Sequence, residues 1–525
     1  MSIHAGRMFI ENLQGSELLL HMNKEERTDG MRREEKHIFE ALEELYASDI
    51  YPFHMPGHKR NMASHLLSRA YGMDITEIDG FDNLHEPQGL ILEAMNRAKR
   101  LYGTKEIFFL VNGSTAGILT AIHACVPYGG KIIVSRNSHK SVYNAIALLN
   151  LETVYLYPAR LSGWELAAGL SADEVEKAIR ENPDAKAILV TSPTYEGFVS
   201  PIRTIAKLAH AAGIPLIVDE AHGAHFPFSK QLPESAIDQG ADLVIQSLHK
   251  TMPAFTQTAL LHFQGNLVQL KSVKRYCSVF QSSSPSYLLM GGIDSCLELA
   301  EERGETLWKD ILEWSESLYE RAKGLKHIRV WCGRKGNEEL FSFQAEKKAE
   351  AKDPLKLILM PVAAVKEGKP YTGIELYREL LDRYRLQMEM MTSAYVLAIL
   401  TCMDRKEGLR RLEKALFEID QSLDFASVDS SETLLRQERV EGASVLEAEE
   451  TIGEAIKKEE EWILLHQAEG RECAAYVNLY PPGIPLIVPG EVISRDLVAT
   501  LLTYSEQDLP LQGLKGDKIP VIKRE

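Results

Sequence analysis

The chain has 525 residues, of which 45% are hydrophobic and 26% are charged, an ordinary composition for a soluble globular protein. At about 150 residues per domain, this length predicts about two to four domains and a sizeable core. Lys and Arg number 59 and Asp and Glu number 75, so the net charge is −16. Such an acidic surface argues against nucleic acid or an anionic membrane as a partner, since both bind basic patches.

The six cysteines are scattered and form no CxxC pair, which argues against a zinc framework or a disulfide scaffold and favours reduced thiols. The start of the chain lacks the basic and apolar segments of a signal peptide. No apolar run reaches the roughly 18 residues of a membrane span. The sequence therefore predicts a cytoplasmic, soluble protein.

Residues 1–36 are polar and charged, and we expect a loose arm or a docking helix. Helical spacing of Ile38, Leu42 and Leu45 predicts a helix over 36–49. From residue 100 to residue 265, short β-branched runs then alternate with amphipathic helical segments. We predict strands at 107–111, 131–135, 187–192, 215–220, 242–247 and 258–263, and helices at 115–126, 141–150, 171–182 and 202–213. This alternation predicts an α/β fold with a mostly parallel sheet, helices on both faces, and ligands beyond the carboxyl ends of the strands.

The second half of the chain is predicted to form a smaller α+β region. A helical tract at 290–325 leads into it, and 355–362 and 474–491 contain strands. Residues 429–461 are rich in Glu and poor in aromatics, which indicates a solvated surface segment. The predicted division is an N-terminal arm at 1–50, a large domain at 51–310 and a C-terminal small domain at 311–525.

Two loops at predicted strand ends have the chemistry of a ligand site. In VNGSTAG, 111–117, Gly113 allows close backbone approach, and Ser114 and Thr115 would stand at a helix N-terminus that attracts phosphate. The alternative is an ordinary Ser or Thr helix cap. In RNSHKS, 136–141, His139 follows a strand and either stacks on a planar ligand or caps the next helix.

Two further loops carry an acid and a lysine. Asp219 ends a buried strand in the motif DEAHG, where a carboxylate can hold a protonated ring nitrogen. His222 and His225 form a weak metal pair with no further ligands, so no metal site is predicted. In QSLHKTMPAFTQ, 246–257, Lys250 follows a buried strand and is a Schiff-base candidate. A phosphate cup, an acid and a lysine 31 residues after that acid together fit pyridoxal 5'-phosphate, PLP.

These motifs, together with PFHMPGHKR, DGFDNLHEPQG, PTYEG and YPPGIPLIVPGE, span residues 51–491. Through them the chain resembles the Orn/Lys/Arg decarboxylases, which are fold-type-I PLP enzymes. PFHMPGHK begins near residue 52, which resembles the short layout without an N-terminal wing domain seen in bacterial arginine decarboxylases. The resemblance implies decarboxylation of arginine, lysine or ornithine to the polyamine-pathway amine and CO2, with arginine favoured by the short layout.

The resemblance also implies residue roles. Lys250 carries PLP, Asp219 pairs with its pyridinium nitrogen, and His139 stacks on its ring. Lys250 or His249 returns the proton to the substrate Cα after CO2 leaves. The other residues assigned to cofactor binding or to the pocket are Gly113, Ser114, Thr115, Thr194, His222, Ser247 and His249.

The motifs identify the residues that recognise the substrate less closely than those that bind the cofactor. Asp82, Glu86 and Glu491 are candidates for holding the distal cation, and the fold implies a homodimer or higher oligomer with active sites at the subunit interface. Asn83 and Glu196 depart from the family patterns DDLHEP and PTYDG and are candidates for an altered substrate choice.

Two alternatives stand beside the decarboxylase. One is another fold-type-I PLP enzyme, such as an aminotransferase, a lyase or a decarboxylase of a different amino acid. The other is a non-catalytic relative, which is disfavoured because both Asp219 and Lys250 are present.

Overall fold

The computed structural model describes residues 36–524 except 49, 51–54, 57–58, 60–66, 162–165, 333–350, 426–445, 449, 481–482 and 508. Nearly all of the predicted polar arm lies outside the described residues, as do most of the loop at 51–60 and the first part of the acidic segment. The elements described below belong to the unit formed by His37–Glu525.

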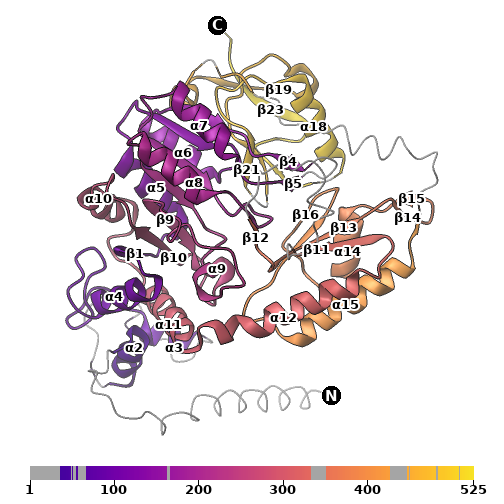
Figure 1. Cartoon of the computed structure of the whole chain (residues 1–525). Helices are drawn as coiled ribbons and strands as arrows, with labels where there is room; N and C mark the ends of the chain where they lie inside the picture. The colour runs from indigo at the N-terminus through magenta and orange to yellow at the C-terminus, as the bar shows by residue number, and fades with distance from the viewer. Residues whose placement is uncertain are drawn as a thin grey trace. The chain divides into compact units, whose positions relative to one another are not determined.

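Within the described residues, a seven-stranded sheet forms the centre of the large domain (Figure 1). The strands run in the order β1 (Glu106–Leu110), β10 (Ala259–Phe263), β9 (Leu243–Ser247), β8 (Leu216–Asp219), β6 (Ala187–Thr191), β2 (Lys131–Ser135) and β3 (Glu152–Leu156). Neighbours from β9 to β3 are parallel, and β10 is antiparallel to both β1 and β9. The prediction of a mostly parallel sheet is confirmed, although the edge strand β3 was not predicted.

Alternating side chains give the sheet two hydrophobic faces. Ile132 and Val134 belong to one core cluster, whereas Ile133 belongs to the other, as the two-residue period of a strand requires. The helices of the first cluster are α5 (Gly113–Cys125), α6 (Lys140–Leu149) and α10 (Leu270–Phe280). The second cluster includes residues of α2 (Ile38–Ala47), α4 (Leu90–Tyr102), α7 (Ala172–Glu181), α8 (Ile202–Ala211) and α11 (Tyr287–Arg303), and it continues into the helices that follow α11.

The helical tract predicted at 290–325 is divided into α11 and α12 (Glu305–Ala322), which meet at Gly304, where φ is 45°. After α12 comes an antiparallel sheet in the order β11 (Ile328–Trp331), β13 (Lys356–Pro361), β17 (Val396–Ile399) and β16 (Met390–Met391). Helices α14 (Gly373–Asp382) and α15 (Lys406–Gln421) pack beside this sheet and α12 respectively. The short strand β12 (Ala351–Lys352) pairs with β7 (Phe198–Val199), which ties this region to the large domain.

The last part of the chain has a hydrophobic cluster of its own. Its strands are β19 (Glu460–Leu464) paired with β23 (Lys518–Ile522), and β20 (Val477–Leu479) paired with β21 (Ile484–Ile487) and β22 (Leu511–Gln512). Its helices are α17 (Ile452–Ala455) and α18 (Arg495–Glu506). The shorter elements of the chain are α3 (Ser68–Met73), α9 (Leu248–Thr251), β4 (Arg160–Leu161), β5 (Leu166–Ala167), β14 (Ala364–Lys366), β15 (Lys369–Pro370) and β18 (Asp424–Phe425).

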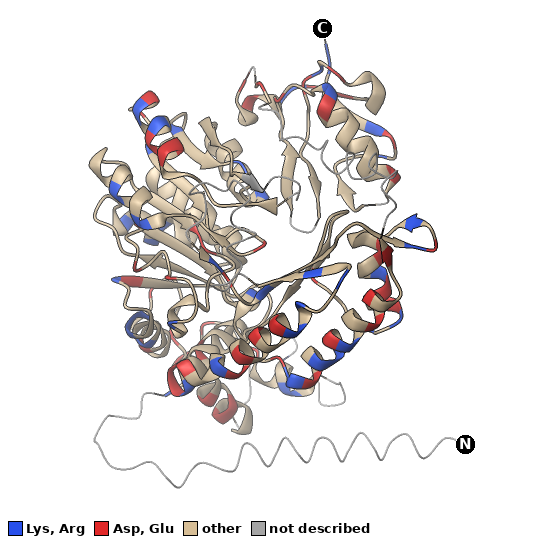
Figure 2. Cartoon of the chain, turned by 45° about the vertical axis from the view of Figure 1, so that its right-hand side comes forward, with Lys and Arg blue, Asp and Glu red and all other residues tan. Residues whose placement is uncertain are grey.

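Lys and Arg residues are interspersed with Asp and Glu residues along the helices (Figure 2). No disulfide joins any of the six cysteines, all of which lie within the described residues. Within the described ranges, no helix combines the length and the apolar character needed to cross a bilayer.

A buried ion pair joins three helices of the second face. Arg97 of α4 donates to both carboxylate oxygens of Asp294 of α11, at 2.8 and 2.9 Å. His37, which precedes α2, has its Nδ1 3.1 Å from the same carboxylate. The hydrogen bond that His37 donates to Asp294 raises the pKa of His37 above its ordinary value.

We predict that the His37–Asp294 contact makes stability fall as the pH rises. A histidine with a raised pKa in the folded state contributes its stability fully below its unfolded pKa of about 6.5. That contribution is lost as the pH rises through the folded pKa. The urea midpoint, measured at a series of pH values upward from about 6.5, should decline, and the decline should be shallower in His37→Gln. Equal slopes in the two proteins would assign the decline to other groups.

Candidate active site

The carboxyl ends of the parallel strands meet at one edge of the central sheet. Thr191 of β6 lies opposite Asp219 of β8, and Asp219 lies opposite Ile245 of β9. The chain segments that follow these strands therefore leave the sheet on the same side, where ligands bind in open α/β sheets. This is the edge that the sequence analysis selected.

Helix α5 begins at this edge directly after β1. Gly113 has a φ of 73°, which permits the turn into the helix, and its N–H donates to Gln257 O at 2.9 Å. Ser247 Oγ, at the end of β9, donates to Ser114 Oγ at 3.0 Å. Ser114 is half-buried and Thr115 is exposed in the first turn. The helix N-terminus thus offers N–H groups and two hydroxyls, which suit an anion.

Asp219 and Lys250 lie at the ends of neighbouring strands. Asp219 is only 4% exposed and accepts a hydrogen bond from Ala221 N at 3.2 Å. Burial raises the pKa of Asp219, and the positive charge of Lys250 opposes that shift. Burial likewise lowers the pKa of Lys250, against the opposing effect of Asp219. The two groups therefore influence each other's charge.

His222 follows β8 and contacts the lysine. Its Nε2 lies 3.1 Å from Lys250 Nζ, and its ring meets the Tyr195 ring edge-on at 4.6 Å between centroids. Burial, with the nearby lysines, lowers the pKa of His222 well below its ordinary value, so the ring is neutral. Among the described residues, no group of three or more His, Cys, Asp or Glu side chains is arranged to hold a metal ion.

The other two predicted histidines are held by local hydrogen bonds. His139 caps α6, because its Nδ1 accepts from Ser141 N at 3.2 Å. Burial lowers the pKa of His139 to about 4. His249 Nδ1 lies 2.9 Å from Thr258 O, to which it donates. The capping interpretation of His139 is confirmed, and its role in stacking stays a prediction.

Thr194 has a local structural role. Its hydroxyl accepts from Phe198 N at 3.3 Å and lies 3.4 Å from Ala167 O, to which it donates. The ring of the neighbouring Tyr195 packs against His222. A part for Thr194 in the pocket stays a prediction.

The structure also brings a group of residues to His222 that the sequence analysis did not select. Lys356, the first residue of β13, has its Nζ 2.8 Å from His222 Nδ1 and is fully buried. Asp353 pairs with His225 at 3.3 Å, and both are buried. The signal available in the sequence was a lysine inside an otherwise apolar strand, LKLILMP.

Two of the acids predicted to bind the substrate cation have partners inside the chain. Asp82 accepts hydrogen bonds from backbone N–H groups at the start of α4, including Gly89 N at 2.8 Å. Glu491 is fully buried and pairs with Arg136 Nη2 at 3.0 Å. Of the variant positions, Glu196 accepts from Tyr395 at 2.8 Å, and Asn83 accepts from His85 N at 2.8 Å.

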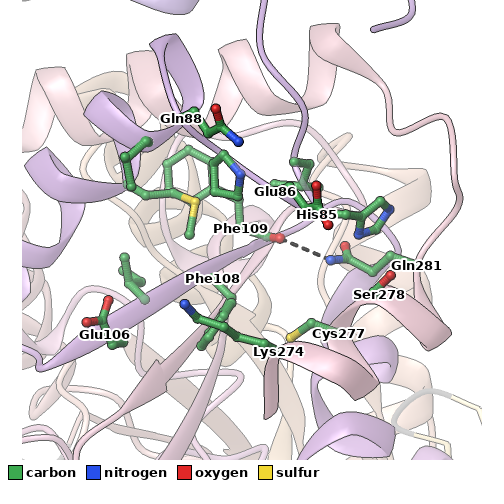
Figure 3. A pocket seen from close by; sticks show the side chains of 15 residues that line it. His85, Glu86, Gln88, Glu106, Phe108, Phe109, Lys274, Cys277, Ser278 and Gln281 are labelled. Carbon is green, nitrogen blue, oxygen red and sulfur yellow. Dashed lines mark hydrogen bonds between the residues drawn. The ribbon is translucent and has the colours of Figure 1, made fainter. Parts of the chain in front are cut away.

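Glu86, the third acid, lines a separate pocket of about 510 Å³ beside the edge strand β1 (Figure 3). The pocket lies between β1, α10 and the segment 84–88. Gln281 satisfies the open edge of β1, since its side chain donates to Phe109 O at 3.3 Å and accepts from Val111 N at 2.8 Å. None of the residues around Lys250 described above lines this pocket.

The sequence profile of the Orn/Lys/Arg decarboxylase major domain matches residues 37–407, and that of the C-terminal domain matches 432–515. The chain belongs to the Orn/Lys/Arg decarboxylase family. Its resemblance to this family, inferred from the motifs, is confirmed.

Related proteins cover nearly the whole decarboxylase chain. An arginine decarboxylase of Bacillus subtilis is 30% identical over 499 residues, which cover 94% of this chain and 98% of the relative. The uncharacterized protein YaaO of the same organism is 33% identical over 485 residues, or 91% of this chain and 95% of the relative.

Structural similarity confirms the predicted fold of this decarboxylase. The crystal structure of the Francisella novicida lysine decarboxylase has a TM-score of 0.78 and 18% identity, over 93% of this chain and 81% of that one. The predicted fold-type-I α/β architecture is therefore confirmed.

We predict that Glu491 stabilises this decarboxylase. Glu491→Gln leaves the buried Arg136 guanidinium without a balancing charge, which costs about 3–5 kcal/mol for a buried pair. The thermal midpoint should fall clearly, whereas the exposed Glu86→Gln should leave it nearly unchanged. The double variant Arg136→Met/Glu491→Leu should recover much of the loss, because no charge is then left alone. An unchanged midpoint in Glu491→Gln would contradict this role.

Proposed function

We propose that this chain is a PLP-dependent decarboxylase of a basic amino acid, with arginine as the first substrate to test among arginine, lysine and ornithine. The observation that carries the proposal is the placement of Lys250 and Asp219 at the ends of neighbouring strands, β9 and β8, where α5 begins. Support for arginine comes from the arginine decarboxylase of B. subtilis, which this chain matches over 98% of that protein's length.

The residues at this edge fit PLP. The first turn of α5, with the hydroxyls of Ser114 and Thr115, suits a phosphate. Asp219, buried and near a single backbone donor, suits a protonated ring nitrogen. Lys250 would hold the aldehyde carbon of the cofactor. When bound, PLP supplies an acceptor for the electron pair that CO2 leaves behind.

Lys250 and His249 are the two residues proposed to donate and accept protons. Burial lowers the pKa of Lys250, which enlarges the fraction of neutral amine that can act as a nucleophile. His249 Nδ1 donates to Thr258 O, so its Nε2 is the nitrogen left to exchange a proton. We propose that Lys250 Nζ or His249 Nε2 returns the proton to the substrate Cα.

The remaining predicted residues would shape the pocket. His139 is neutral at physiological pH because its pKa is about 4, so its ring can lie against a planar cofactor without adding charge. His222 and Thr194 would line the same space, with Ser247 and Gly113 at the phosphate end.

None of the three acids predicted to hold the distal cation is free beside Lys250, since Glu86 lines the separate pocket. Asp82 and Glu491 are engaged with α4 and Arg136. We propose that a second copy of the chain, in a homodimer or a higher oligomer, supplies part of the pocket. We further propose a cytoplasmic location, in keeping with a soluble substrate.

The central test is CO2 release from arginine, lysine and ornithine. We expect Lys250→Ala to lose at least about a thousandfold in kcat and to lose the visible absorbance of lysine-bound PLP. The exposed Lys274→Ala, which removes a lysine of the separate pocket, should retain both.

Wild-type turnover in Lys250→Ala would overturn the proposed mechanism. Consumption of a neutral amino acid, with none of the three basic ones consumed, would favour another fold-type-I activity.

A further inference from the structure

Three nitrogen-bearing side chains form a buried row. Lys250 Nζ lies 3.1 Å from His222 Nε2, and His222 Nδ1 lies 2.8 Å from Lys356 Nζ. Lys250 belongs to α9 and His222 to the loop after β8, both in the large domain, whereas Lys356 begins β13 of the second sheet. One imidazole therefore connects the predicted cofactor lysine to a lysine that has no assigned role.

Hydrogen-bond chemistry limits the charge of this row. A neutral imidazole has one donor and one acceptor nitrogen, and an ammonium group can only donate. If both lysines were ammonium ions, both imidazole nitrogens would have to accept, which a neutral ring cannot do. If His222 were protonated, both lysines would have to be neutral. With both contacts satisfied, the three groups hold at most one positive charge.

Acids stand near both lysines of the row: Asp219 and Glu389 favour the ammonium form of Lys250, and the Tyr195 ring adds to the acids that favour it on Lys356. The carboxylates of Asp353 and Glu389 favour the ammonium form of Lys356, while Lys250 and Lys352 oppose it. Its Nζ also lies 5.7 Å from the centre of the Tyr195 ring, a favourable position for a cation. Because Lys356 is fully buried and its amine contacts His222, that ring is the acceptor at hand for its proton.

The absence of a side chain at Gly197 allows Lys356 to reach this position. Gly197, in the loop after β6, has a φ of 96°, and a Cβ there would lie 2.8 Å from Lys356 Cγ. Any side chain at residue 197 would push Lys356 away. Asp353 N donates to Gly197 O at 2.8 Å, which fixes the turn that leads into β13.

We propose that Lys356 is a positioning residue that donates to His222 Nδ1, holds the ring as the Nε2–H tautomer, and through it supplies a proton to Lys250 Nζ. In this step one N–H bond breaks at Lys356 and one forms at Nδ1, while the Nε2–H bond breaks and an N–H bond forms at Lys250. The row keeps its single charge, which moves from Lys356 to Lys250. The meaning of this transfer for catalysis rests on the proposed function, but the tautomer does not.

The titration behaviour of the row is consistent with this role. Burial lowers the pKa of Lys356 to about 8, so its proton can be given up near neutral pH. The groups that face His222 are Lys250, Lys356, His139 and His249, and all four lower its pKa in addition to burial. His222 therefore passes a proton on and does not retain it.

Lys352 provides a matched control. It is 4% exposed, its pKa is also lowered by burial to about 8, and it lies four residues from Lys356. Its Nζ, however, donates to the carbonyl oxygens of Lys356 and Asp353, at 2.5 and 3.2 Å, and not to His222. Lys352→Met thus removes a second buried cation that makes no hydrogen bond to His222, and it leaves both contacts of the row in place.

The test compares the full chain with Lys356→Met and Lys352→Met, each freed of cofactor. The ¹⁵N shifts of labelled histidine, with His222 assigned through His222→Gln, should report the Nε2–H tautomer in the wild type and in Lys352→Met. In Lys356→Met, Lys250 becomes the only lysine in the row, donates to Nε2, and should reverse the ring to Nδ1–H.

The second measurement is the pH dependence of Lys250 labelling by an amine reagent, followed by mass spectrometry. Without the competing ammonium, the pKa of Lys250 should rise by about one unit or more in Lys356→Met, so that labelling near neutral pH falls about tenfold. In Lys352→Met labelling near neutral pH should not fall, because loss of Lys352 favours the ammonium form of Lys356 and leaves Lys250 at least as reactive.

An Nδ1–H tautomer in the wild type would overturn the proposal without any variant. So would a Lys356→Met protein that folds, by circular dichroism, and keeps either the Nε2–H tautomer or the wild-type labelling profile. Neither readout uses the cofactor or a substrate. Failure of the chain to decarboxylate a basic amino acid would therefore refute the proposed function and leave this result standing.

Discussion

The parallel pairing of β6, β8 and β9 is the constraint on which the candidate site depends. Backbone hydrogen bonds set Thr191, Asp219 and Ile245 side by side, so three chain segments must leave the sheet at one edge. β10 lies between β1 and β9 and is antiparallel to both, so β1 and β9 run in the same direction. The N-terminus of α5, which follows β1, therefore lies at the same edge. Tyr195, His222, Lys250 and Ser114 come together because the ladder gives their loops a common side.

The second sheet contributes a buried lysine, Lys356 of β13, to the candidate site at this edge. A lysine without exposed surface is unstable unless hydrogen bonds and opposite charges compensate for its lost hydration. Lys356 has such compensation from His222, Asp353 and Glu389. The β7–β12 pairing and the close approach at Gly197 hold it there. The region beyond α12 is therefore part of the candidate site as well as a support for it.

Local patterns predicted much of the large domain. The strand KIIVS was predicted at its observed bounds, and the strands ending at Asp219 and Ser247 were predicted to within a residue, because fully buried strands are continuous apolar runs. β3, ETVYL, was missed because an edge strand carries polar residues and its sequence lacks that run. The break at Gly304 was also missed, since apolar residues continue with helical spacing on both sides of it.

The sequence by itself determined the alternation of strands and helices, the motif order and, through the family profile, membership of the Orn/Lys/Arg decarboxylases. These depend on neighbours in the chain or on fixed spacings. Only the tertiary structure decided which charges meet. It paired Glu491 with Arg136, and it brought Lys356 to His222, which lies 134 residues earlier in the chain. Burial decides the charge of each such group, and burial is a property of the assembled fold that no local pattern contains.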